Sequence, residues 1–276
     1  MTQEKKNRPG SKAKKSPEVP ENIDLSSASN RKELSKLFHD TAMELWEEDG
    51  QWDEAYFEFK QAVEYDSDNI DALADFADFL LESEEFDETL DLVEKGLQLA
   101  PEDSRFCTLK GNVYRCRGDY KLSLRQYDLA IELNPKDYLA FYGRGISRDI
   151  LGKSGAMDDL TECLRIRNDF VSAWYDRGVI QTTDGNLEAA IADYTQAVEL
   201  DPDFIQAYVT RGDLFAVLGK YEAAMADFDK AIELDPENPD PYYYRAMAWS
   251  EQGNKKKAQK DFETARQLGF DEDEEE

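Results

Sequence analysis

The sequence has 276 residues, with 61 acidic side chains against 33 basic ones and a formal net charge of −28. Such a negative field repels phosphate, which excludes nucleic acid and an anionic membrane surface as main partners and favours a protein or peptide with a basic segment. No apolar run of transmembrane length and no apolar core of a signal peptide occurs, so we expect a cytoplasmic protein. The three cysteines show no CxxC pairing, which argues against a disulfide framework or a zinc site and agrees with a reducing compartment.

The two ends of the chain are strongly charged. Residues 1–30 hold few apolar side chains and predict a disordered basic tail. The basic side chains of this tail are Lys5, Lys6, Arg8, Lys12, Lys14 and Lys15. Residues 271–276 are all acidic and predict a solvated acidic tail.

Between these tails, over residues 31–272, the sequence repeats itself. Glycines recur every 33 or 34 residues, at Gly118, Gly152, Gly185, Gly219 and Gly253. Gly50 falls in the same register, and Glu84 stands where a further glycine is missing. Glycine readily takes the positive φ that ends a helix, so this column predicts the turn inside each of a series of helix pairs.

Three further columns share that register, one of large side chains and two of mostly small ones. The large column consists of Phe59, Val93, Tyr127, Leu160, Tyr194, Phe228 and Phe262. The small columns are Met43, Ala77, Gly111, Gly145, Gly178, Gly212 and Ala246, and Ala62, Gly96, Ala130, Cys163, Ala197, Ala231 and Ala265. Small residues let helix axes approach closely, and a large side chain gives each pair an apolar anchor. Residues 187–202 also show the helical period, while no stretch alternates as a strand would, so the fold class is all-α.

These columns resemble the tetratricopeptide repeat family, whose repeat is a helix–turn–helix unit of about 34 residues. The resemblance covers residues 36–272 and is most complete over residues 171–238. It implies a right-handed superhelical solenoid of antiparallel helix hairpins and a protein–protein interaction scaffold. The expected units are 36–69, 70–103, 104–137, 138–170, 171–204, 205–238 and 239–272. No extra capping helix follows the seventh unit, so the last hairpin is expected to fray or to pack on another molecule.

Two charged columns accompany the later units. They consist of Arg144, Arg177, Arg211 and Arg245 in the first helices, and Asp159, Asp193, Asp227 and Asp261 in the second helices. An arginine that faces the groove between helices needs a partner, so we predict that the two columns pair. The alternative is a row of arginines that binds a carboxylate ligand.

The first two units hold most of the excess negative charge. From Asp40 to Asp103 the chain has 23 acidic residues against only Lys60 and Lys95. First helices line the concave face in the family that this sequence resembles. The carboxylates of these two first helices are Asp40, Glu44, Glu47, Asp71, Asp75, Asp78 and Glu82. Like charges three or four residues apart share a helix face and repel, so a cationic ligand would relieve them. The alternatives are a merely solvated face, or a surface onto which the basic tail folds back.

The later first helices offer a different set of candidate groove residues. They are Asn112, Tyr142, Tyr175, Asp213 and Tyr243. Rigid aromatic side chains are common anchors at interfaces, although tyrosine is equally common where helices pack. Some members of the resembled family grip a C-terminal carboxylate with lysines, asparagines and an arginine. Here only Asn112, with Arg105 and Arg115 nearby, fits such a clamp, so the clamp is not expected.

Enzymatic chemistry has little support in the sequence. His39 is the only histidine, which excludes multi-histidine metal sites, and it stands in a helix-packing column. Gly152–Ser154 resembles the end of a phosphate loop, but position 147 is serine rather than the required glycine. We therefore expect no catalytic, metal or cofactor site, and a groove that binds a basic peptide or helical segment. The alternative is a structural subunit of a complex that docks through its terminal hairpin or convex face; the oligomeric state is not predicted.

Overall fold

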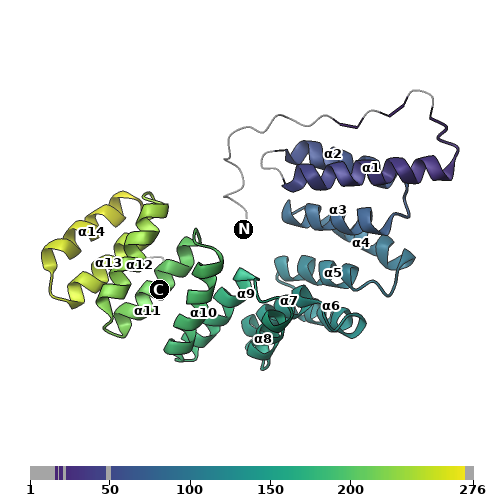
Figure 1. Cartoon of the computed structure of the whole chain (residues 1–276). Helices are drawn as coiled ribbons and strands as arrows, with labels where there is room; N and C mark the ends of the chain where they lie inside the picture. The colour runs from purple at the N-terminus through teal and green to yellow at the C-terminus, as the bar shows by residue number, and fades with distance from the viewer. Residues whose placement is uncertain (1–15, 18, 21–22, 48–50, 271–276) are drawn as a thin grey trace. The chain divides into compact units, whose positions relative to one another are not determined.

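The computed structural model describes residues 16–17, 19–20, 23–47 and 51–270. These residues form 14 α-helices and no strand, which confirms the predicted all-α class (Figure 1). In chain order the helices are α1 (Ala28–Glu47), α2 (Trp52–Tyr65), α3 (Ile70–Glu82), α4 (Phe86–Leu99), α5 (Ser104–Cys116), α6 (Tyr120–Leu133), α7 (Tyr138–Ile150), α8 (Ala156–Ile166), α9 (Val171–Thr183), α10 (Leu187–Leu200), α11 (Ile205–Val217), α12 (Tyr221–Leu234), α13 (Asp240–Glu251) and α14 (Lys255–Gln267). The basic side chains from Lys5 to Lys15, Gly50 and the acidic tail 271–276 lie outside the described residues.

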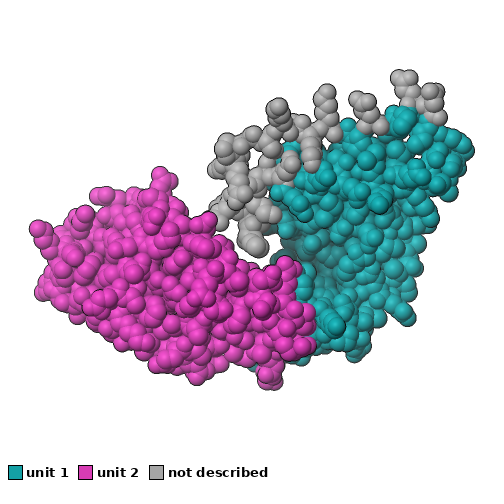
Figure 2. Space-filling model, viewed as in Figure 1, with its two compact units in different colours: residues 1–153 teal, residues 154–276 magenta. Residues whose placement is uncertain are grey.

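The helices fall into two compact units, residues 1–153 and residues 154–276 (Figure 2). In the first unit α1 packs on α2, α3 on α4 and α5 on α6, and α7 follows. In the second unit α8 is followed by the pairs α9–α10, α11–α12 and α13–α14. These pairs are the hairpins that the repeat predicts.

The first helices of the first unit form a layer of their own. Helix α1 contacts α3, α3 contacts α5, and α5 contacts α7. The second helices α2, α4 and α6 each contact the first helices on both sides of them (Figure 1). Side chains that share a register on α1, α3, α5 and α7 are therefore neighbours across this layer, and we call its solvent-facing side the first-helix face.

The turns inside the hairpins follow the glycine column. Gly118, Gly152, Gly185, Gly219 and Gly253 all have positive φ, between 60° and 77°. Glu84 takes the same conformation, with φ of 62°, where the column lacks a glycine. The prediction that this column marks the turns is confirmed, including the substitution at position 84.

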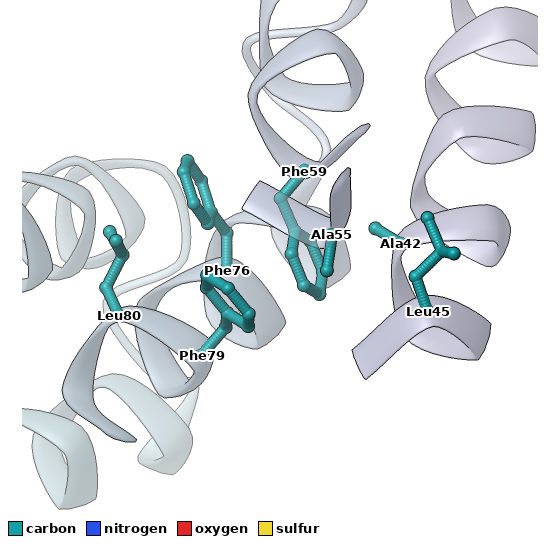
Figure 3. Close-up of a cluster of buried hydrophobic side chains, with 7 residues drawn as sticks. All are labelled: Ala42, Leu45, Ala55, Phe59, Phe76, Phe79 and Leu80. Atoms are coloured by element: carbon teal, nitrogen blue, oxygen red, sulfur yellow. The ribbon is translucent and has the colours of Figure 1, made fainter. Parts of the chain in front are cut away.

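Six of the seven residues of the large column are buried, with Phe262 half-buried, and the small columns make room for them. Phe59 is fully buried and stacks on Phe76 with ring centroids 5.5 Å apart, inside a cluster with Phe79 and Leu80 (Figure 3). The fit is tight where a small column holds glycine, since Cβ atoms placed on Gly111, Gly178 and Gly212 would lie 2.6, 2.7 and 2.9 Å from the large ring of the same hairpin. A Cβ atom placed on Gly96 would lie 2.2 Å from the ring of Phe106, which leaves no space for any larger residue.

Both ends of the described chain pack on their nearest hairpin. Val19 and Ile23 lie against the buried cluster of α1 and α2 that contains Phe38, ahead of the start of α1 at Ala28. At the other end, Phe270 donates its backbone N–H to the Ala265 carbonyl at 2.9 Å. Its ring stacks on Tyr243 of α13 with a centroid distance of 4.0 Å. The sequence did not indicate this closure of the last hairpin by a single aromatic residue.

Candidate partner-binding surface

The predicted acidic residues of the first unit lie on α1 and α3, two helices that contact each other. Asp40, Glu44 and Glu47 lie on the exposed side of α1. Asp71, Asp75, Asp78 and Glu82 follow one another along α3, the helix packed against α1. The two helices therefore present seven carboxylates on neighbouring elements.

Three of the α3 carboxylates have partners on adjacent first helices. Asp71 forms an ion pair with Arg105 at 2.9 Å, and Asp75 is 2.8 Å from Nε2 of His39. Glu82 accepts a hydrogen bond from the Trp46 indole N–H at 3.1 Å. His39 therefore has the satisfied structural role that its packing column indicates. These contacts also tie α1, α3 and α5 together.

Asp78 is the α3 carboxylate with neither an ion pair nor a hydrogen bond to a side chain among the described residues. Its side chain is half-buried between helices, and burial raises its pKa to about 6, with further contributions from the charges of Glu82 and Asp75. A carboxylate with a raised pKa is one whose negative charge its surroundings do not stabilise. A cation from a partner would supply the positive charge that the Asp78 carboxylate lacks.

The next first helix carries a different group. The Tyr127 hydroxyl donates to Oδ1 of Asn112 at 2.7 Å, and the Arg115 guanidinium lies beside the same hydroxyl. Tyr142 of α7 lies near the Arg115 guanidinium. Asn112 and Tyr142, both predicted groove residues, therefore belong to one cluster with Arg115.

The remaining predicted residues lie in the second unit, where two of the three are engaged in packing. Tyr175 packs against Tyr194 and Phe204, with ring centroids 5.5 and 5.0 Å away, and burial raises its pKa to about 12. Tyr243 is stacked on Phe270. Asp213 is half-buried on α11. The structure places Tyr175 and Tyr243 as packing residues with partly accessible rings.

The arginine and aspartate columns pair, as predicted, in three hairpins. Arg177 holds Asp193 through two hydrogen bonds of 2.7 Å, and Gln181 donates a third at 2.7 Å. The same two-bond pairing joins Arg211 to Asp227 and Arg245 to Asp261.

Each of these arginines also reaches the preceding second helix. Arg177 contacts Thr161 at 3.3 Å, and Arg245 contacts Asp229. In the first unit, Arg144 pairs with Asp128 at 2.7 Å. The arginine column therefore joins neighbouring helices. This structural role explains the repeated arginines, and no bound ligand is needed to explain them.

Glu58 is a feature that the sequence reasoning missed. It occupies the aspartate column of the first hairpin, but the arginine position there holds Ala42. The Glu58 side chain is 1% exposed, and neither carboxylate oxygen makes a hydrogen bond of normal geometry to a described residue. Burial raises its pKa, an effect that the nearby Ser16 hydroxyl only partly offsets. The repeat register could have predicted this feature, because an acidic residue stands in the aspartate column of a hairpin whose arginine position holds alanine.

Other chemical groups are sparse in the described part of the chain. No group of three or more His, Cys, Asp or Glu side chains within it is arranged to hold a metal ion. Cys107 and Cys163 are buried thiols whose pKa burial raises, and Cys116 is exposed. None of the described helices combines the length and apolar composition needed to cross a bilayer.

Comparison with known proteins gives one consistent family. Models of the tetratricopeptide repeat match residues 48–113, 104–137 and 171–204, and a model of the TPR repeat matches residues 212–253. A tetratricopeptide repeat and J domain-containing co-chaperone, DNJ1 of Cryptococcus neoformans var. grubii, is 36% identical over 74 residues. That match spans 26% of this chain and only 14% of the co-chaperone.

Solved structures agree on the fold. PilF of Pseudomonas aeruginosa is similar with a TM-score of 0.66 and 16% identity, over 79% of this chain and 99% of PilF. A tetratricopeptide repeat protein of Parabacteroides merdae gives a TM-score of 0.56 and 20% identity, over 87% of this chain and 95% of that one. YrrB, a TPR protein with an unusual peptide-binding site, gives 0.51 and 22% identity, over 71% of this chain and 97% of YrrB. With the 14 helices of its described residues in consecutive pairs, the chain is a tetratricopeptide repeat protein, a member of a family of generally non-catalytic protein-interaction scaffolds.

Proposed function

We propose that this protein binds a basic peptide or helical segment of a partner protein on the first-helix face of its first unit. Asp78 carries the proposal, because its carboxylate is held half-buried beside Asp75 and Glu82 without a cation of its own. Asp40 and Glu44 on α1 extend the negative surface across the neighbouring helix. The peptide-binding site of YrrB, a protein of similar fold, supports a peptide as the kind of ligand.

A comparison of two baits tests this proposal. The native chain is compared with a variant in which Asp40, Glu44, Asp78 and Glu82 become asparagine or glutamine. Asp71 and Asp75 stay unchanged because they pair with Arg105 and His39, so their loss would disturb packing. Bound proteins are captured from the source cell's lysate at low and moderate salt. We expect one basic protein on the native bait, absent from the variant and weakened by salt.

The matched control removes the same number of carboxylates from the other layer. It changes the exposed Asp53, Glu54, Glu64 and Asp91 of α2 and α4. This control should retain the basic protein, because the first-helix face is intact. If both variants lose the basic protein equally, binding depends on the net charge of the chain and not on a defined surface.

The last hairpin favours a second candidate function, docking on a larger assembly. A hollow of about 310 Å³ opens on it, lined mainly by α14 side chains that include Lys255, Phe262 and Arg266. Its lining combines apolar Ala258 and Phe262 with charged Lys255, Glu263 and Arg266, a mixture that suits a protein partner. Light scattering across a range of protein concentrations tests self-association. A Phe262→Ala variant that leaves the mass unchanged, or a native chain that stays monomeric throughout, would rule out assembly of copies through this hollow.

A further inference from the structure

Arg115 differs from the other half-buried arginines described above. Arg177, Arg211 and Arg245 each hold an aspartate through two hydrogen bonds. Arg115 makes no ion pair with any residue in the described ranges, and its Nε atom is buried without a hydrogen-bond partner. The chain carries 61 acidic side chains, so an unpaired arginine in a half-buried position is a specific departure. Such a cation favours an anion that approaches from outside.

The surroundings of Arg115 are rigid. The Tyr127 ring is fully buried, and Cβ atoms placed on Gly111 and Gly143 would lie 2.6 and 2.4 Å from it. Two helices therefore close on the two sides of one phenol. Its hydroxyl is held by Asn112 at 2.7 Å and lies beside the guanidinium. Tyr127 is a positioning residue, while Arg115, Asn112 and Tyr142 keep partly accessible side chains.

Arg115 lies one repeat away from the acidic surface. Asp78 and Asn112 occupy the same register on the packed helices α3 and α5, and Arg115 follows Asn112 by three residues. The first-helix face therefore changes from negative to positive between two adjacent helices. Packed helix axes are about 8–10 Å apart. An extended peptide advances about 3.3 Å per residue, so about three residues bridge that distance.

We infer that the partner segment carries an acidic side chain about three residues from its basic one, and that Arg115 and Asn112 bind this carboxylate while Asp78 and Glu82 bind the cation. The inference rests on the proposed function and specifies the chemistry of the ligand. A phosphate group fits less well, because its larger negative charge would lie close to the α3 carboxylates. The acidic residue lies within the segment, so it does not require a free chain end.

A peptide library tests the pairing on the full chain. The peptides are amidated, share one fixed lysine and vary at the neighbouring positions, and a second set has free C-terminal carboxylates. We expect the native chain to select Asp or Glu at one position two to four residues from the lysine. Arg115→Gln should lose this selection and bind the selected peptide roughly ten-fold more weakly, as for one charge-assisted hydrogen-bonded contact. Arg115→Glu should select a second basic residue instead.

Controls separate the possible failures. Arg125→Gln removes an exposed arginine of α6 and should keep the native selection. Thermal melting of the Arg115 variants checks that their folding is intact. Lysine-dependent binding with no acidic preference would overturn this inference and leave the proposed function standing, as would a preference for free C-termini alone. If the native chain retains no lysine-bearing peptide, both fail.

Discussion

At the scale of single residues, the backbone at position 84 holds a side chain where the repeat normally places glycine. Glu84 has φ of 62°, a conformation that costs a residue with a Cβ atom about 1–2 kcal/mol. Glu84→Gly removes that cost, although glycine loses more conformational entropy on folding. We expect the variant to gain about 0.5–1 kcal/mol of unfolding free energy in urea titration. The control Gly118→Ala, at a φ of 77°, should lose a similar amount of unfolding free energy. If Glu84→Gly is less stable than the native chain, the backbone at position 84 is not strained.

Asp78 gives stability a defined dependence on pH. Its pKa is about 6 in the folded chain, against 3.8 for an aspartate fully exposed to water. The folded state therefore binds the proton more tightly than the unfolded state does. The contribution of Asp78 therefore becomes less favourable as pH rises from about 4 to about 6 and is constant above that. Asp78→Asn should stabilise the chain by about 1–3 kcal/mol at pH 7 and by little near pH 4.

Urea titrations of both proteins across that pH range measure the difference. Asp40→Asn serves as the matched control, because it removes an exposed carboxylate from the same face. It should change the unfolding free energy by less than Asp78→Asn does at pH 7. A gain from Asp78→Asn that is equal at pH 4 and pH 7 would contradict the raised pKa.

At the scale of helices, the arginine–aspartate pairs join the two helices of one hairpin, and the same arginines also contact the preceding hairpin. The Asp193 side chain is 5% exposed and accepts three hydrogen bonds, two of them from Arg177. Asp193→Ala leaves a half-buried guanidinium that keeps its contacts with Thr161 and the Trp174 ring but loses its carboxylate partner. We expect a loss of about 1–3 kcal/mol of unfolding free energy.

A related aspartate provides the control for that change. Asp229 also pairs with an arginine, Arg245, but its side chain is 65% exposed. Asp229→Ala should cost less than about 1 kcal/mol, because water screens an exposed ion pair. Equal losses from the two substitutions, measured by urea titration, would mean that burial does not set the strength of these pairs.

At the scale of the whole molecule, the sequence predicts best the features that a repeated position determines alone. Glu84 and the Arg177–Asp193 pair follow from register, because each column has one structural reason that recurs in several hairpins. The candidate site is less predictable from the sequence. Asp78 and Arg115 look like any other charged residues there, and only the side chains of neighbouring helices make them half-buried and unpaired. Whether Tyr243 is accessible depends likewise on Phe270, which follows the last helix. A single sequence shows the acidic residues of the surface but not which of them lack a partner.

The two units also differ in how their charges are balanced. The three two-bond arginine–aspartate pairs lie in the second unit, while residues 40–103 of the first unit carry 23 acidic residues and two lysines. A repeat array is stabilised hairpin by hairpin, so repulsion in the first unit acts mainly there. Salt screens this repulsion over about 10 Å at 0.1 M.

Raising the salt concentration from low to moderate should therefore stabilise the first unit more than the second, by about 0.5–1 kcal/mol. Hydrogen exchange read by mass spectrometry measures this, because it reports opening helix by helix. We expect slower exchange in α3 and α4 with salt, and little change in α9 to α12. The variant that lacks Asp40, Glu44, Asp78 and Glu82 should lose most of the salt response. A response that is uniform over both units would mean that the negative charge acts on the molecule as a whole, and would weaken the case for a basic ligand at α3.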